Sequence, residues 1–391
     1  MEQGQKNAES IADLQQLDYV YTAWVQPTGD TKYTDKRIAD GSINPDKGIE
    51  GGLLYPAGII PFGQSACPGL YHNQTANASY SALAGVEYYK YTMDEEYLRD
   101  YLYDYLKGCA AFYETWMEHD EATGQYNIYA GYHEQSWGYN PTIELQTIYF
   151  IFDTIVNASE TLGVDADKRE KWIDIRDNLA PLPTADCNGK EVIAFAEKKW
   201  NGGDNYEFDS SLVKTDGNVC QLDGILLDGM IGYFSSPETL QLVRNTLDVS
   251  EPAWARGNHF TRVYASAVRS RYDINKIVSE LAKTINQNMQ ANLRIKDPYH
   301  GVEKCGTTVA VNEMLLLSDE GITKLFPNWY VDKNAKFGNL RAKGAFIVSA
   351  EYDGTAQEAK NVVVTSEKGQ TMTLVSPWSE GATVRDSREM L

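Results

Sequence analysis

One carboxyl group in the first half of the chain lies in an aromatic stretch of sequence. The segment GYHEQSW (131–137) contains Glu134, and four aromatic residues lie within a few positions of it: Tyr129, Tyr132, Trp137 and Tyr139. Aromatic, partly dry surroundings raise the pKa of a carboxyl, and a carboxyl that stays protonated near neutral pH can serve as a general acid. The alternative is an exposed loop glutamate that accepts a hydrogen bond from a backbone amide.

A second segment carries residue types that suit a sugar. PAWARGNHF (252–260) holds Trp254, Arg256 and His259. An indole ring can stack on a sugar ring, and Arg and His side chains can hydrogen-bond to sugar hydroxyl groups. Ordinary packing, with Asn258 as a helix cap, explains the same residues equally well.

Composition narrows the class of ligand. The chain has 391 residues and a formal net charge of −20, so it repels phosphate backbones, and we expect no nucleic-acid partner. Tyrosine is unusually frequent, with 26 Tyr against 11 Phe and 8 Trp. Tyr and Trp offer both an apolar face and a polar tip, which suits neutral sugars, although an amphipathic core lining accounts for any single ring.

Other sequence signals are weak or absent. The five cysteines form no CxxC pair, so neither a structural zinc site nor a disulfide framework is indicated. No metal or organic cofactor is expected. No window approaches the roughly 18 uninterrupted apolar residues of a membrane span. The first residues, MEQGQKNAES, lack the basic start and apolar core of a signal peptide, so either the chain starts after processing or the protein is not exported. The oligomeric state is left open.

Hydrophobic periodicity predicts long helices from about residue 75 onward. Thr92 and Glu95 form a possible capping box for a helix that ends near Trp116, and the next helix is expected between Pro141 and Gly163. Further helices are expected at 165–179, at 237–247 after a Ser236 cap, and at 258–270, 273–289 and 307–318.

Beyond Pro327 the period changes to that of a strand. Apolar residues alternate from Phe346 to Tyr352, and NVVVTSEKGQTMTLV indicates a hairpin that turns near Lys368-Gly369. We therefore predict a mainly α protein in three parts. These are an irregular arm (1–74), an (α/α)6-type helical toroid (75–326) and a small β-rich appendage (327–391).

Several of these stretches resemble glycoside hydrolase family 95, the helical-barrel α-L-fucosidases and their relatives. VNEMLLLSDEGITKLFPNW (311–329) with GNLRAKGAFIVSAEYDG (338–354) resembles the passage from the last barrel helix into the C-terminal β domain. VEYYKYTMDEEYLRDYLYDYLKGCAAFYETWM (86–117) and PTIELQTIYFIFDTIVNASETLGVD (141–165) resemble the two helices that flank the loop carrying the acid. The likeness covers about residues 80–365 and implies a six-hairpin glycosidase fold.

The resemblance implies catalytic roles for two glutamates. Glu134 takes the place of the family's proton donor, with Tyr132-His133 where the family has Ser-Pro. The family activates water with an Asn polarised by an Asp; the position of that Asp is Val302 here, and the neighbouring Glu303 is the candidate base, with a surface glutamate as the alternative. An inverting pair of carboxyls stands about 6.5–9.5 Å apart.

The resemblance also indicates residues that bind substrate. His133 and Trp137 flank Glu134, while Trp254, Arg256 and His259 lie where the family has a Gly-Trp-Ser segment. Asp223 and Asp228 lie near the position of a His-rich segment of the family, whose histidine pattern this chain does not share.

The sequence therefore favours a glycoside hydrolase that acts on a neutral oligosaccharide or polysaccharide by inversion, of the α-L-fucosidase or α-L-galactosidase kind. A non-catalytic glycan-binding relative that has lost the base is the first alternative. A polysaccharide lyase on a similar toroid is the second, and the negative charge and the five histidines disfavour it. The family implies an extracellular or periplasmic protein, and the missing signal sequence leaves a cytoplasmic one open.

Overall fold

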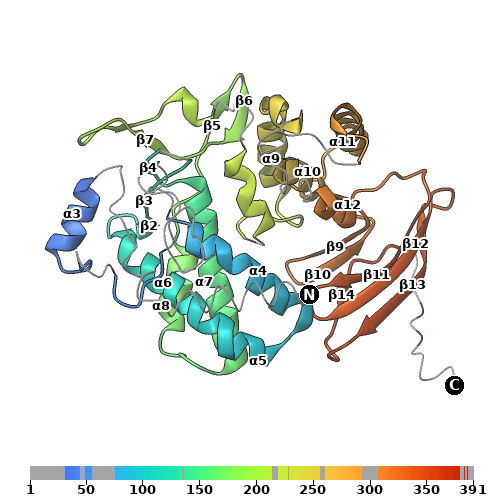
Figure 1. Ribbon diagram of the computed structural model, residues 1–391, viewed down its shortest axis with the longest axis horizontal. Coiled ribbons are helices and arrows are strands. Elements are labelled where there is room, and N and C mark those ends of the chain that lie inside the picture. Colours follow the sequence, from blue (N-terminus) through green and yellow to red (C-terminus); the bar gives the residue numbers. More distant parts are fainter. Residues whose placement is uncertain are drawn as a thin grey trace.

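The computed structural model describes residues 31–44, 49–54, 75–133, 136–213, 219–227, 229–255, 260–292 and 307–378, with positions 383 and 385. Within these residues the helices form two groups, each around its own hydrophobic core, and β sheets at the C-terminal end pack beside them (Figure 1).

The first helical group precedes residue 178. It consists of α3 (Thr31–Ala39), α4 (Asn77–Thr92), α5 (Glu95–Tyr97), the π-helical turn η2 (Leu98–Leu102), α6 (Tyr103–Trp116), α7 (Thr142–Leu162) and α8 (Arg169–Asp177). Large side chains fill its core, among them Phe112, Trp116, Phe150, Phe152 and Trp172. Ile43, Ile49 and Leu53 from the preceding segment are buried in the same core, so part of the predicted arm belongs to the helical body.

The predicted helix up to Trp116 is confirmed, but its cap is not Thr92. Thr92 is the last residue of α4, and its hydroxyl donates to the carbonyl of Tyr88 at 2.8 Å. The carboxylate of Asp94 instead accepts the backbone N–H of Tyr97 at 3.1 Å and so caps α5. Met93, in the left-handed conformation, ends α4 and separates the two helices. The residue directly before α5 is therefore Asp94, a favourable N-cap, and Thr92 is too far back to cap it.

Helix α7 begins and ends where its sequence signals predict. Pro141 precedes it in an extended conformation, and Gly163 ends it with φ 69°. A left-handed residue at this position favours glycine, because a β-carbon would be strained there.

Short strands lie between the helices. β1 (Glu118–Asp120) pairs with β2 (Gln125–Asn127), and β5 (Thr184–Cys187) pairs with β6 (Lys190–Ile193). A four-stranded antiparallel sheet contains β3 (Tyr129–Ala130), β4 (Gly138–Tyr139), β7 (Lys198–Trp200) and β8 (Tyr206–Glu207), in the order β3-β4-β7-β8. All named strand pairs between described residues 75 and 315 are antiparallel.

The second helical group follows. It comprises the short 3-10 turns η3 (Ser210–Leu212), η4 (Cys220–Leu226) and η5 (Glu251–Ala255) and the helices α9 (Pro237–Val249), α10 (Phe260–Arg269), α11 (Ile274–Asn288) and α12 (Thr307–Leu315). The side chain of Ser236 caps α9 as predicted, accepting the N–H of Thr239. Val243, Trp254, Tyr264 and Ile277 lie in the core of this group.

The β-rich part begins at Leu316, earlier than the predicted start at 327. β9 (Leu316–Asp319), β10 (Ile322–Leu325) and β14 (Thr373–Leu374) form one sheet, and β11 (Ala335–Ala342), β12 (Phe346–Asp353) and β13 (Glu358–Ser366) form another. The predicted helix 307–318 was therefore too long, because the apolar run 315–317 passes directly into a strand. The hairpin predicted at Lys368-Gly369 was wrong, since β14 pairs in parallel with β10 and not with β13.

A mainly helical protein with a β-rich C-terminal part is thus confirmed. Closure of the helices into an (α/α)6 ring stays a prediction, because the described helices do not by themselves complete one.

Candidate functional site

The loop between α6 and α7 is held in place by buried polar side chains. Asn140 is buried; its side-chain oxygen accepts the N–H of Ile128 at 3.0 Å, and its amide donates to Asn127 and to Glu197, each at 2.9 Å. The hydroxyl of Thr142 donates to the carbonyl of Ala194 at 2.6 Å. The end of the loop that leads into α7 is therefore fixed both to residues 127 and 128 and to the segment that carries β7.

Glu134 and Gln135 lie outside the described residues. The residues on either side, His133 and Ser136, are hydrogen-bonded to each other. The Ser136 hydroxyl accepts the N–H of His133 at 2.7 Å and lies 2.6 Å from its carbonyl, and the Ser136 N–H donates to the same carbonyl at 3.2 Å. The rings of His133 and Tyr132 each lie 6.3 Å from the ring of Phe195. Burial raises the pKa of Tyr132. The neighbours of Glu134 are thus partly dry and aromatic, as the sequence predicts.

Trp137 lies in the protein interior. Only 2% of it is exposed; its indole N–H donates to the hydroxyl of Tyr206 at 2.9 Å, and its ring packs edge-on against Trp116. A sugar has no open face of this ring to stack on, so the role of Trp137 here is to fix the loop.

Trp254 is a core residue as well. It is 2% exposed, its N–H donates to the carbonyl of Leu247 at 3.3 Å, and the rings of Tyr264 and Tyr272 each lie 5.5 Å from it. Packing, the alternative to sugar stacking, therefore explains its place. Its predicted neighbours Arg256 and His259 lie outside the described residues, as does Glu303.

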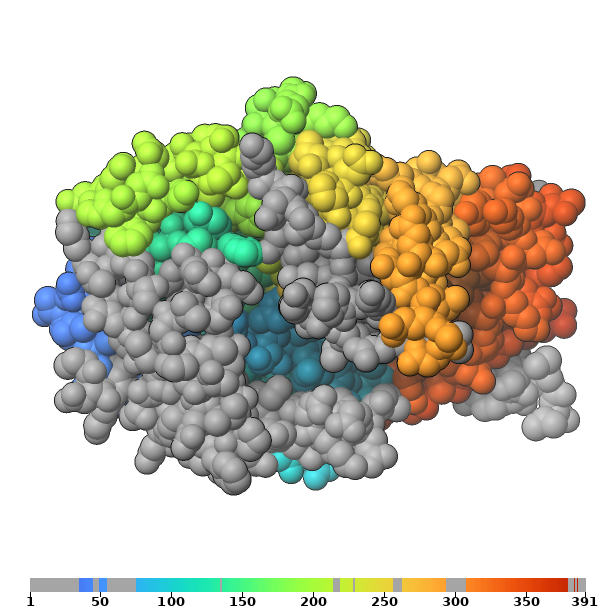
Figure 2. Space-filling view, turned by 45° about the horizontal axis from the view of Figure 1, so that its top comes forward, coloured from blue at the N-terminus to red at the C-terminus, as the bar shows by residue number. Residues whose placement is uncertain are grey.

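A hollow lies beside the loop. Figure 2 shows α4, in blue, set back in a depression, with the green segment around residues 130–140 and an orange helix of the second group among the parts around it. The described part of the loop between α6 and α7 thus borders a concave surface, which is the usual setting of a ligand site.

An ion pair with a buried carboxylate joins η4 to α10 close to α4. Nε of Arg262 lies 2.5 Å from Oδ1 of Asp223, which is 4% exposed. Burial raises the pKa of Asp223 to about 6, although Arg262 opposes the shift. The negative charge of Asp223 also helps burial to raise the pKa of Tyr80, on α4. The pairing with Arg262 could not be predicted from the sequence, because it joins two separate elements.

A second buried carboxyl fixes the start of α4. Glu144 is fully buried; it accepts the hydroxyl of Thr75 at 2.6 Å, the N–H of Thr75 at 3.2 Å and the hydroxyl of Tyr113 at 3.0 Å. Burial raises its pKa to about 7, while these hydrogen bonds oppose the shift. With its lone pairs occupied, Glu144 positions the start of α4, a role that the sequence analysis missed. The one sequence feature that pointed to Glu144 was its position in the first turn of the predicted helix after Pro141.

The family model of the glycosyl hydrolase family 95 catalytic domain matches residues 62–191. The chain resembles glycoside hydrolase family 95. The matched range contains α6, the Glu134 loop and α7, so the resemblance predicted from those segments is confirmed.

One curated protein agrees with this family. Alpha-L-fucosidase 2 from Arabidopsis thaliana is 25% identical over 290 residues, which are 68% of this chain and 33% of that protein. The chain therefore spans about a third of the length of this relative. Among solved structures, a putative kojibiose phosphorylase from human microbiome is similar with a TM-score of 0.42 and 11% identity, covering 83% of this chain and 51% of that one. The family and the fucosidase support a glycoside hydrolase.

Two further findings concern the described residues alone. None of their helices is both long and apolar enough to cross a bilayer. No group of three or more His, Cys, Asp or Glu side chains within them is arranged to hold a metal ion.

Proposed function

We propose that this protein is a glycoside hydrolase that cleaves a neutral glycan, with Glu134 as the proton donor. The observation that carries the proposal is the match of residues 62–191 to a family 95 catalytic domain, because this range includes the Glu134 loop. The position of that loop at the rim of the hollow supports it (Figure 2).

The surroundings of the loop suit an acid. Tyr132 and Phe195 supply apolar surface beside it, and such surface favours the neutral form of a carboxyl. Asn140 ties residues 127 and 128 to the α7 end of the loop, and Thr142 fixes that end to Ala194, so the described parts of the loop have a defined scaffold. In this account the Glu134 carboxyl donates its proton to the oxygen of the leaving sugar as the glycosidic bond breaks.

Inversion requires a base on the opposite face of the sugar ring. We assign this role to Glu303. Val302 stands at the position of the family's Asp, and Glu303 is the next residue. The carboxylate takes a proton from water, and the water oxygen bonds to the anomeric carbon. The substrate in this proposal is an α-L-fucoside or an α-L-galactoside.

Hydrolysis of a glycan panel tests the proposal. Neutral α-L-fucosides and α-L-galactosides are expected to be cleaved, with the inverted anomer appearing first in proton NMR spectra. Polyanionic glycans are expected to be poor substrates, because a chain of net charge −20 repels them. An unsaturated product from a uronate polymer would instead show a lyase.

Replacement of Glu303 by Gln tests the base. Because a base is needed whatever the leaving group, Glu303→Gln should slow cleavage of both natural oligosaccharides and activated aryl glycosides. Unchanged rates would remove Glu303 from the mechanism. A wild-type protein that binds neutral glycans and hydrolyses none of the panel is a glycan-binding relative.

A further inference from the structure

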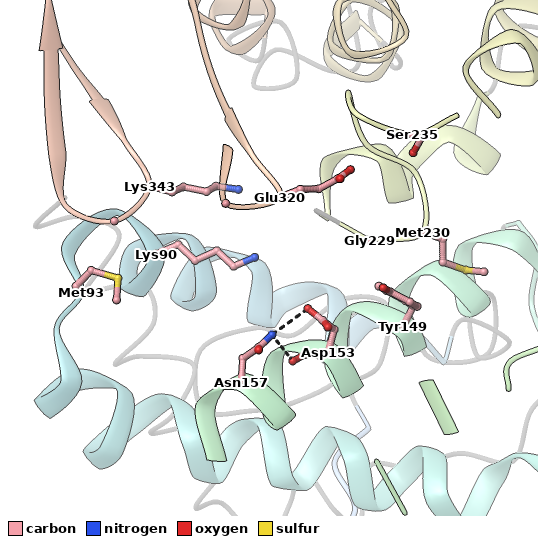
Figure 3. A pocket seen from close by; sticks show the side chains of 12 residues that line it. Lys90, Met93, Tyr149, Asp153, Asn157, Gly229, Met230, Ser235, Glu320 and Lys343 are labelled. Carbon is pink, nitrogen blue, oxygen red and sulfur yellow. Dashed lines mark hydrogen bonds between the residues drawn. The ribbon is translucent and has the colours of Figure 1, made fainter. Parts of the chain in front are cut away.

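A second pocket lies where the helical body meets the β-rich part. It has a volume of about 810 Å³, and its walls come from α4, α7, the segment before α9 and the turns β9–β10 and β11–β12 (Figure 3). This volume is within the range of about 300–1,000 Å³ that is usual for small-molecule sites.

The pocket is distinct from the Glu134 loop. That loop joins the start of α7, whereas the pocket is lined by Tyr149, Asp153 and Asn157 farther along the same helix. From Thr142 to Asn157 the helix rises about 20 Å. On α4 the pocket is likewise lined by Lys90, near the C-terminal end, rather than by the start of the helix.

The walls of the pocket are fixed against each other. The N–H of Gly344 donates to the carbonyl of Lys90 at 2.7 Å, and Nζ of Lys343 lies 3.1 Å from Oε1 of Glu87. The N–H of Tyr233 donates to Oδ2 of the buried Asp319 at 2.9 Å, which ties the segment before α9 to β9. A cavity whose walls are bonded in this way is preformed, so a ligand need not order it.

The charged side chains of the lining are two lysines and two carboxylates, and they come from three parts of the fold: α4, α7 and the β turns. Figure 3 shows the side chains of Lys90 and Lys343 reaching into the cavity from one side and Glu320 entering from the β9–β10 turn. Both carboxylate oxygens of Asp153 already have partners within the protein. Nη1 of Arg176 lies 3.0 Å from Oδ1, and the side-chain amide of Asn157 donates to Oδ2 at 3.1 Å.

Of the two carboxylates in the pocket, Glu320 is the more available acceptor. No hydrogen bond to its carboxylate is found from any residue that the structure describes, and burial raises its pKa. Its backbone is left-handed, with φ 49°, an uncommon conformation for a glutamate. Gly232 leaves room for the carboxylate, because a β-carbon there would lie 2.2 Å from Oε1.

We infer that this junction pocket is a second, non-catalytic site for a neutral mono- or disaccharide. Sugar hydroxyls both donate and accept, so they can donate to Glu320 and accept from a lysine ammonium across the cavity. Tyr149 and Met230 add less polar surface for the carbon face of the ring. The balance of two lysines against two carboxylates disfavours an anion as the ligand.

Titration with free sugars tests this inference. L-Fucose, D-galactose and D-glucose are added to the full chain and to its Glu320→Gln and Glu367→Gln variants, with binding followed by calorimetry and ligand-observed NMR. Gln keeps the shape of Glu320 but loses a charge-assisted hydrogen bond, so affinity for the bound sugar should fall about tenfold or more. Glu367, which is paired with Arg341 on the exposed face of the β part, is the matched control and should leave binding within about twofold.

Several results would overturn the inference. The first is that none of the three sugars binds. The second is that Glu320→Gln binds the sugar as tightly as wild type, or that Glu320→Gln and Glu367→Gln lose affinity equally. The third is that D-glucuronate or inorganic phosphate binds more tightly than the neutral sugars.

The same variants separate this site from the proposed hydrolysis. Glu320→Gln should hydrolyse oligosaccharides at the wild-type rate, and Glu134→Gln should still bind the sugar at the junction pocket. If the wild type hydrolyses nothing but Glu320→Gln loses sugar binding, the inference stands and the proposed function falls. If Glu320→Gln instead loses hydrolysis together with binding, the pocket is not a separate site.

Discussion

Glu144 and Asp223 are carboxyls that the fold keeps out of water in different ways. Glu144 has neutral hydrogen-bond donors around it, whereas Asp223 faces the guanidinium of Arg262. In both, burial raises the pKa, to about 7 and about 6 respectively. Such groups make the stability of the protein depend on pH.

The free energy of unfolding should fall as Glu144 ionises. Its folded pKa of about 7 lies above the ordinary value of 4.5, so the stabilisation is complete below about pH 4.5 and is lost as the pH rises through 7. The full difference amounts to roughly 3 kcal/mol. Chemical denaturation of wild type and Glu144→Gln between pH 5 and pH 8 should show wild type losing stability relative to the variant.

Glu367→Gln is the control for this comparison. Its partner Arg341 lowers the pKa of Glu367, so that carboxyl is ionised throughout the window and the difference from wild type should be flat. A flat difference for Glu144→Gln as well would show that Glu144 does not titrate in this range.

Residue types alone predicted the surroundings of Glu134 but not which aromatic rings face a ligand. The loop is rich in Tyr and Trp, and the structure does place rings beside it. Trp137 and Trp254 were nevertheless predicted to bind substrate, whereas both are buried in the hydrophobic cores of the two helical groups. Their partners, Tyr206 and Tyr264, come from other segments, and one sequence does not show such contacts.

At the scale of elements, the joint between α4 and α5 depends on one cap. Asp94→Ala should cost about 1 kcal/mol of stability, because the N–H of Tyr97 loses its acceptor. Thr92→Ala is the matched control, since the Thr92 hydroxyl only bonds back to the carbonyl of Tyr88 within α4. Urea unfolding of both variants checks the assignment, and a larger loss for Thr92→Ala would restore the capping box predicted from the sequence.

Elements with local signals were predicted well, and those set by distant pairing were not. The Pro141 start, the Gly163 stop and the Ser236 cap each depend on a few adjacent residues, and all three are confirmed. β14 pairs with β10, about fifty positions earlier in the chain, so its own alternation suggested the wrong partner. The strands between 184 and 207 are two to four residues long and largely polar, too short for a periodic signal.

At the scale of the whole molecule, a buried cation joins the helices to the β-rich part. Arg269, at the end of α10, pairs with Glu313 of α12 at 2.7 Å and lies 4.0 Å from Asp319 of β9. It also donates to the carbonyl of Ile225 at 2.5 Å. The two carboxylates raise its pKa, although burial opposes them.

Arg269→Met should destabilise the protein by about 3–5 kcal/mol, because it leaves buried carboxylates without their cation. Arg341→Met, which breaks an exposed pair with Glu367, should cost no more than about 1 kcal/mol. Thermal unfolding of the two variants measures the contrast. Equal effects would mean that the β-rich part is held mainly by its apolar contacts.

The most direct test of the account is the hydrolysis of two substrates by Glu134→Gln. A general acid supplies about 10²–10⁴-fold, so the variant should lose that factor on a natural oligosaccharide and much less on an activated aryl glycoside, whose leaving group needs little protonation. Binding of the oligosaccharide should persist, since Gln keeps the shape of the side chain. Full activity of Glu134→Gln on the natural oligosaccharide would contradict the account.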